Sequence, residues 1–127
     1  MESIVTVTFS GGLDISRYPE IAAGFRNCPD SGECVIVDLS DAKWLDSVFM
    51  TDLLLFYRKN LKLNRAMIVV ARDGVARMLT IAGLAKRLRI VSDYDDAKRI
   101  PLNARKRARK TARPLTEFHF EVPDETN

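Results

Sequence analysis

Two short apolar runs, residues 34–39 and 66–71, constrain the fold of this 127-residue chain more than any other feature. Both are rich in Val and Ile and have at most one polar residue near the exit, which is typical of strands buried on both faces of a sheet. Each run is followed by a segment with apolar residues at helical spacing. In the first segment these are Met50, Leu53, Leu54, Tyr57 and Leu61. Alternating strands and helices favour βαβ units, with mostly parallel pairing and right-handed crossovers.

The remaining elements extend this pattern along the chain. Residues 4–9 are β-branched and alternating, which predicts a first strand, and Pro19 suits the first turn of a following helix. Residues 89–91 form a further short strand, followed by a helix to about residue 99. We therefore expect one domain over residues 1–100 and a C-terminal extension over residues 101–127. Phe118, Phe120 and Val122 alternate with polar residues and predict one added strand at 117–122.

The net charge of +3 is unevenly distributed along the chain. Residues 1–103 carry nearly equal numbers of basic and acidic side chains, residues 104–113 carry only basic ones, and residues 114–127 carry only acidic ones. The basic side chains of the middle segment are Arg105, Lys106, Arg107, Arg109, Lys110 and Arg113. Such a segment can contact nucleic-acid phosphates, but no aromatic residue is interleaved for base stacking. A solvated tail is the simpler interpretation, so nucleic-acid binding is not the favoured function.

Several classes of function lack the residues that they need. No stretch approaches the roughly 18 uninterrupted apolar residues of a membrane span, and residues 1–10 lack the pattern of a signal peptide. We therefore expect a cytoplasmic protein in which Cys28 and Cys34 are thiols. With one histidine and two cysteines, a metal site is not expected. No catalytic Ser/His/Asp set or Gly-rich phosphate loop is present, so we expect neither an enzyme nor a cofactor.

The start of the helix after residue 45 concentrates the candidate site residues. Asp46 or Ser47 is a suitable N-cap, and Thr51 adds a second hydroxyl. Phe49 and Met50 are either core residues or part of an adaptable binding surface. Trp44 is either packed over the end of the sheet or available for a contact. A capped helix start with these neighbours suits a protein–protein contact.

The order of elements and four separate sites resemble the STAS domain, specifically the bacterial anti-sigma factor antagonists. The resemblance covers about residues 3–99, and only the combination of motifs is specific. The matching pieces are Gly12-Leu13-Asp14 with Pro19-Glu20, Val35–Ser40 with Leu45-Asp46-Ser47, Ala71-Arg72 with Val75–Leu79, and Gly83-Leu84. It implies a STAS-type sandwich: a four- to five-stranded mixed sheet, mixed at its N-terminal edge, with helices on one face.

The same resemblance implies a switch from which one residue is missing. In the family, the helix start reads Asp-Ser-(Ser/Thr)-Gly, and the second hydroxyl accepts phosphate from a serine kinase that is also the anti-sigma factor. Asp46 and Ser47 match the first two positions, but Val48 occupies the acceptor position and Phe49 replaces Gly. Because Val48 has no oxygen to phosphorylate, the usual switch is absent. Ser47 is the alternative phosphoacceptor, although we expect its hydroxyl to be engaged as an N-cap.

The sequence thus predicts a regulatory interaction module that binds an anti-sigma factor or serine kinase. The expected partner-binding residues are Trp44, Asp46, Ser47, Val48, Phe49, Met50 and Thr51. Two alternatives stay open: a nucleic-acid-associated protein using residues 104–113, and a structural STAS subunit of a larger assembly. Residues 118–120 could also add a strand to a neighbour, which would fit such an assembly or a homodimer.

Overall fold

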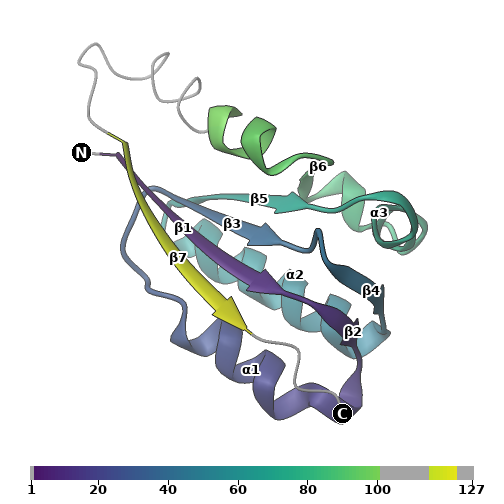
Figure 1. Cartoon of the computed structure of the whole chain (residues 1–127). Helices are drawn as coiled ribbons and strands as arrows, with labels where there is room; N and C mark the ends of the chain where they lie inside the picture. The colour runs from purple at the N-terminus through teal and green to yellow at the C-terminus, as the bar shows by residue number, and fades with distance from the viewer. Residues whose placement is uncertain (1, 101–114, 123–127) are drawn as a thin grey trace.

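A five-stranded parallel sheet forms the centre of the molecule (Figure 1). The computed structural model describes residues 2–100 and 115–122, so the basic run at 104–113 lies outside the described residues. The strand order is β6-β5-β3-β1-β7. In that order, the strands are Arg89–Val91, Ala66–Val70, Cys34–Asp38, Glu2–Phe9 and Leu115–Val122. The expected α/β class is confirmed.

All the strand pairs described in this sheet are parallel, so the expectation of a mixed sheet is wrong. β1 lies between β3 and β7, and Val7 pairs with Val37 on one side and with Phe120 on the other. Antiparallel neighbours are commonly joined by tight turns, whereas parallel neighbours need a crossover. β1 to β3, β3 to β5 and β5 to β6 are each joined by a crossover, as parallel neighbours require, and the edge strand β7 also runs in the direction of β1.

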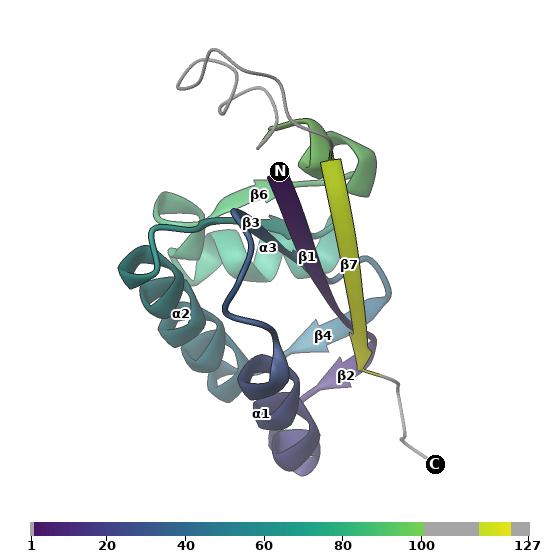
Figure 2. The same cartoon turned by 90° about the vertical axis from the view of Figure 1, so that its left-hand side faces the viewer.

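Helices cover both faces of the sheet, which corrects the expectation of helices on one face only (Figures 1 and 2). The side chains of Val5, Val7 and Phe9 point to one face and belong to the larger core. That core is covered by α1 (Tyr18–Asn27), α2 (Ser47–Lys62) and α3 (Asp73–Ile81). On the other face Ile4, Ile36 and Ile68 pack with Ala97 from the helical residues 94–100. The Tyr94 hydroxyl lies 2.8 Å from that of Thr6 on this face.

A second, two-stranded parallel sheet lies next to the start of α2. It pairs β2 (Gly11–Leu13) with β4 (Ala42–Leu45), two segments for which the sequence analysis predicted no strand. The 3-10 helix η1 (Ile15–Arg17) follows β2, and α2 follows β4. Because β2 and β4 are paired, η1 is brought beside the first residues of α2.

Two buried arginines hold the loops around this framework. The Nη1 of Arg17 donates to the backbone carbonyls of Ser10 and Gly12, at 2.6 and 2.9 Å, and stabilises the turn between β1 and β2. The Nη1 of Arg65 donates to the carbonyls of Pro29 and Ser31, at 2.6 and 2.8 Å. These bonds tie the entry to β5 to the loop between α1 and β3. Among the described residues, no helix has the length and apolar character needed to cross a membrane.

Candidate functional site

Asp46, one of the two N-caps that the sequence offered, fixes the start of α2. Its Oδ1 accepts the backbone N–H of Phe49 at 2.9 Å, and its Oδ2 accepts the backbone N–H of Ile15 at the same distance. The first bond satisfies one of the free amides of the helix end. The second attaches η1 to that end. One carboxylate therefore sets the relative position of two elements that border the candidate site.

Ser47 lies at the first helical position and is exposed, because Asp46 is the cap. The expectation that capping engages the Ser47 hydroxyl is therefore wrong. The Thr51 hydroxyl, one turn later, is also exposed and donates to the carbonyl of Ser47 at 2.9 Å. Ser47 thus presents its hydroxyl to solvent at a helix N-terminus, where exposed N–H groups favour an anion.

Phe49 is a core residue and does not belong to the exposed surface, which corrects its assignment as a partner-binding residue. Its side chain is only 1% exposed. The ring centroid lies 5.4 Å from that of Phe9 and 5.7 Å from that of Phe25, both distances typical of packed aromatic pairs. Val48 and Met50 on either side of it are half-buried. Phe49 therefore anchors the helix start in the core, while Val48 and Met50 remain partly accessible.

A hollow of about 230 Å³ opens between α2 and the end of α3. From α2 it is lined by Ser47, Met50, Thr51 and Leu54, and from the other side by Ala82 and Leu84. The neighbouring Ile81, at the last position of α3, is 77% exposed. The structure thus brings three of the predicted residues into one shallow, largely apolar depression with two hydroxyls on its rim. We call this depression the α2–α3 hollow.

Trp44 lies on β4, two residues before the cap, and is 46% exposed. Its ring lies against the backbone of Gly12, where a Cβ would come within 2.2 Å of the ring. Only glycine at position 12 permits this close approach. Ile15 on η1 is 67% exposed, so the helix start has exposed apolar side chains from several elements around it.

The acidic residues near this start hold turns together. Asp14 caps η1 by accepting hydrogen bonds from the hydroxyl and the backbone N–H of Ser16. These bonds, helped by smaller contributions from Trp44 and Arg17, keep the pKa of Asp14 below its ordinary value although some desolvation opposes them. Asp38 similarly accepts the backbone N–H of Ser40 at 3.0 Å. The carboxylates of Asp14 and Asp38 are therefore used in local structure.

The chemistry available at the hollow is that of a contact surface. Apolar side chains exposed together on a protein mark interaction sites more often than singly exposed ones do. Met50 adds a flexible thioether that adapts to different partner shapes. Among the described residues, no group of three or more His, Cys, Asp or Glu side chains is arranged to hold a metal ion.

The sequence analysis missed the part of the site that α3 and the following turn contribute. Ile81, Ala82 and Leu84 are more than twenty residues away from the predicted helix start. One signal was present: Ile81 is a large apolar residue off the buried stripe of Val75 and Leu79. Gly83, with φ of 84°, adopts the left-handed conformation that is common at helix C-termini. That turn places Leu84 back toward α2.

Comparison with known proteins gives one family and one fold. The family model described as "STAS domain" matches residues 1–97. Among solved structures, the chain is similar to the STAS domain of a SulP transporter from Vibrio cholerae, with a TM-score of 0.66 and 13% sequence identity. That alignment covers 82% of this chain and 84% of the other. A search of curated proteins found no match.

Proposed function

The chain belongs to the STAS domain family of protein-interaction and regulatory modules, and from this premise we propose that it docks a protein partner at the start of α2. The proposed partner is an anti-sigma factor or serine kinase in the cytoplasm, and the chain itself performs no catalysis. The α2–α3 hollow is the observation that carries this proposal, since it combines Met50, Leu54 and Leu84 in one surface, and the exposed Ile81 precedes its lining residue Ala82.

Regulation at this surface would differ from that of relatives with a hydroxyl at position 48. Val48 offers no phosphate acceptor, whereas the exposed hydroxyl of Ser47 lies on the rim of the hollow. A phosphoryl group there would add about −1.5 to −2 charge beside apolar side chains. The helix end would tolerate that charge, but an apolar partner surface would not. We therefore propose Val48 as the residue that keeps the module constitutively competent to bind, unless Ser47 is modified.

Titration calorimetry with the anti-sigma factors of the host organism tests the docking surface. We expect saturable binding to at least one of them, and we expect Thr51→Glu and Ile81→Glu each to weaken it by tenfold or more, roughly the effect of losing one good interface contact. Leu61→Glu is the matched control: Leu61 is 58% exposed on the same α2 helix but lies near its other end. If no host anti-sigma factor binds, or if the Leu61 variant loses as much affinity as the others, the proposal fails.

Phosphopeptide mass spectrometry after incubation with a binding kinase and ATP tests the proposed regulation. We expect no phosphate on the chain, or phosphate on Ser47 alone. A Ser47→Ala variant should then bind the kinase as tightly as the unmodified protein. Stoichiometric phosphate on Thr51 would contradict the assignment, because the Thr51 hydroxyl is bonded to the Ser47 carbonyl.

The fold shared with a transporter STAS domain supports one second candidate, a structural STAS unit of a larger assembly. A stable stoichiometric complex in which Thr51→Glu and Ile81→Glu have no effect would favour it. The nucleic-acid alternative rests on residues 104–113, outside the described part of the chain. It predicts DNA or RNA binding that falls steeply with salt and disappears when residues 104–127 are removed.

A further inference from the structure

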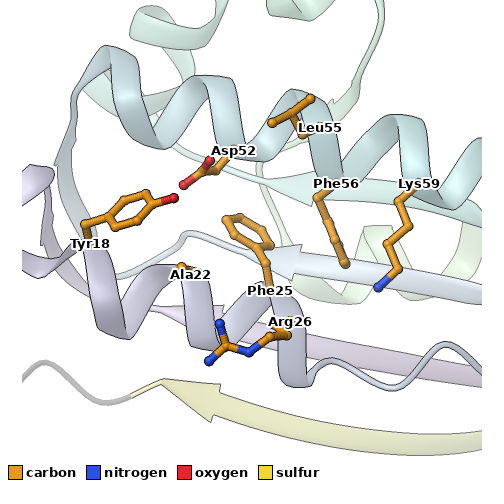
Figure 3. A pocket seen from close by; sticks show the side chains of 8 residues that line it. All are labelled: Tyr18, Ala22, Phe25, Arg26, Asp52, Leu55, Phe56 and Lys59. Atoms are coloured by element: carbon orange, nitrogen blue, oxygen red, sulfur yellow. The ribbon is translucent and has the colours of Figure 1, made fainter.

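A separate groove of about 330 Å³ lies on the other side of α2, between α2 and α1 (Figure 3). Its floor is made by Phe25 and Phe56, whose ring centroids are 4.9 Å apart. Tyr18 from α1 and Leu55 from α2 line its rim, and both are exposed. A volume near 300 Å³ and an aromatic lining are typical of a site for a small organic molecule. We call this site the α1–α2 groove.

One carboxylate oxygen at this groove lacks a partner. The Oδ2 of Asp52 is buried, and no donor among the described residues lies within hydrogen-bond distance of it. Figure 3 shows the hydroxyl end of Tyr18 directed toward the Asp52 carboxylate at one end of the groove. A buried, unpaired polar atom destabilises a fold, which makes such an atom unusual unless a ligand uses it.

The electrostatics at the two ends of the groove differ. At the Asp52 end, the nearby charge of Asp46 adds to the negative potential. Burial raises the pKa of Asp52, and the charge of Asp46 raises it further. At the other end, the Nζ of Lys59 lies 2.9 Å from Asp30, so its charge is paired. The guanidinium of Arg26 also lines the groove, on its α1 side (Figure 3). The attraction for a cation is therefore local to the Asp52 carboxylate, while the charge of Lys59 at the other end is neutralised by Asp30.

We propose that the α1–α2 groove binds a small organic cation with an apolar body, whose ammonium or guanidinium group bonds to Asp52. The cation supplies the donor that Oδ2 lacks. The apolar body covers Phe25 and Phe56. A neutral apolar ligand would leave the carboxylate oxygen unpaired, and an anion would be repelled by it. This site is independent of the α2–α3 hollow and of any protein partner there.

Three probes with the same phenyl body separate these possibilities: 2-phenylethylamine, 2-phenylethanol and phenylacetate. Each is titrated into the full-length, ¹⁵N-labelled protein at mildly alkaline pH, and amide shifts are followed by NMR. We expect the amine to perturb amides of α1 and α2 around the groove and to bind roughly tenfold tighter than the alcohol, since a hydrogen bond to a charged group is worth more than a neutral one. Phenylacetate should bind weakest.

Two variants assign the effect to one side chain. Asp52→Asn keeps the shape of the side chain and removes its charge, so the amine should lose its tenfold advantage over the alcohol. Asp41→Asn removes the same charge from an exposed turn away from the groove, and the advantage should persist. The proposal is overturned by equal binding of the three probes, by tightest binding of phenylacetate, by shifts confined to the α2–α3 hollow, or by an amine preference that survives in Asp52→Asn.

Discussion

Asp46 accepts one hydrogen bond on each oxygen of its carboxylate, so both the start of α2 and the position of η1 depend on this side chain. The sequence offered Asp46 and Ser47 as alternative caps, because both precede the apolar stripe of the helix. The bond to Ile15 could not be predicted, since it depends on the unexpected pairing of β2 with β4. Because Asp46 is the cap, the hydroxyl of Ser47 is left at the surface.

Asp46→Ala should lower the free energy of unfolding by about 1 to 2 kcal/mol, because it removes an N-cap together with a second hydrogen bond. Urea denaturation followed by circular dichroism measures the change. Ser47→Ala is the matched control and should shift stability by less than about 0.5 kcal/mol, as expected for an exposed position. Equal effects of the two substitutions would show that Ser47, rather than Asp46, caps the helix in solution.

Asp52→Asn should stabilise the fold at neutral pH, with a pH dependence of defined sign. Burial and Asp46 raise the folded-state pKa of Asp52 above its ordinary value of 3.8, so its charged form opposes folding. That opposition is absent well below pH 3.8, grows as the pH rises through the folded-state pKa, and is complete above it. Because much of the side chain is solvated, we expect a gain on the order of a few tenths of a kcal/mol.

Paired urea titrations of wild type and Asp52→Asn across this pH range check that prediction through the difference between the two proteins. The contribution of the other titrating groups is the same in both proteins, so it cancels in this difference. A variant that is less stable than wild type at neutral pH would show that the ionised carboxylate is satisfied in solution. Such a result would also count against the orphaned oxygen described for the groove.

At the scale of elements, long periodic segments were predicted well and short ones were not. The helix from residue 47 to residue 62 is where its spacing indicated, but its buried stripe is Phe49, Leu53, Phe56 and Asn60. Leu61, expected in the stripe, is instead 58% exposed. Periodicity places a stripe only to within a residue because several apolar faces fit the same helix. β2 and β4 have three and four residues, too few for any periodic pattern to show.

The packing of α1 against β1 and β7 depends on Gly24. A Cβ at this position would lie 2.7 Å from Cγ2 of Val122 and 2.9 Å from Cε1 of Phe9. Gly24→Ala should therefore destabilise the fold by about 1 to 3 kcal/mol despite the better helix propensity of alanine. In Val122→Ala the obstructing methyl is gone, so the double variant should be more stable than the sum of the two single effects predicts.

Thermal or urea unfolding of the four proteins in this cycle measures the coupling. Gly74→Ala in α3 is a suitable control, because no atom lies within 4 Å of the added methyl group and the substitution should be neutral or stabilising. Strictly additive losses at positions 24 and 122 would mean that β7 does not pack on α1 of its own chain in solution.

At the scale of the whole molecule, the α/β class and the order of the elements were predictable, but the arrangement of layers was not. Continuous apolar runs showed that the strands are buried on both faces, and that burial requires a cover on each. The helix at residues 94–100 supplies the second cover. Its short apolar pattern did not reveal on which face it lies. The direction of β7 was equally hidden, since an alternating strand pairs in either direction.

Removing residues 101–127 tests how far the sheet depends on β7. We expect the shortened chain to lose stability and to self-associate, because β1 then becomes an exposed edge and the buried Val122 leaves the core. Light scattering after size-exclusion chromatography and a thermal melt report the two effects. Removal of residues 123–127 alone keeps β7 and serves as the control. A shortened chain that stays monomeric and equally stable would show that residues 1–100 need no seventh strand.

The pairing of β1 with β7 also sets an order of events during synthesis. β1 leaves the ribosome well before β7, one of its two neighbours, because the other elements of the fold lie between them in the sequence. Until β7 has been synthesised, one side of β1 therefore offers unpaired backbone groups to whatever strand is near. On a crowded polysome that strand can belong to another nascent copy, which makes the last strand a safeguard against misassembly between neighbouring chains.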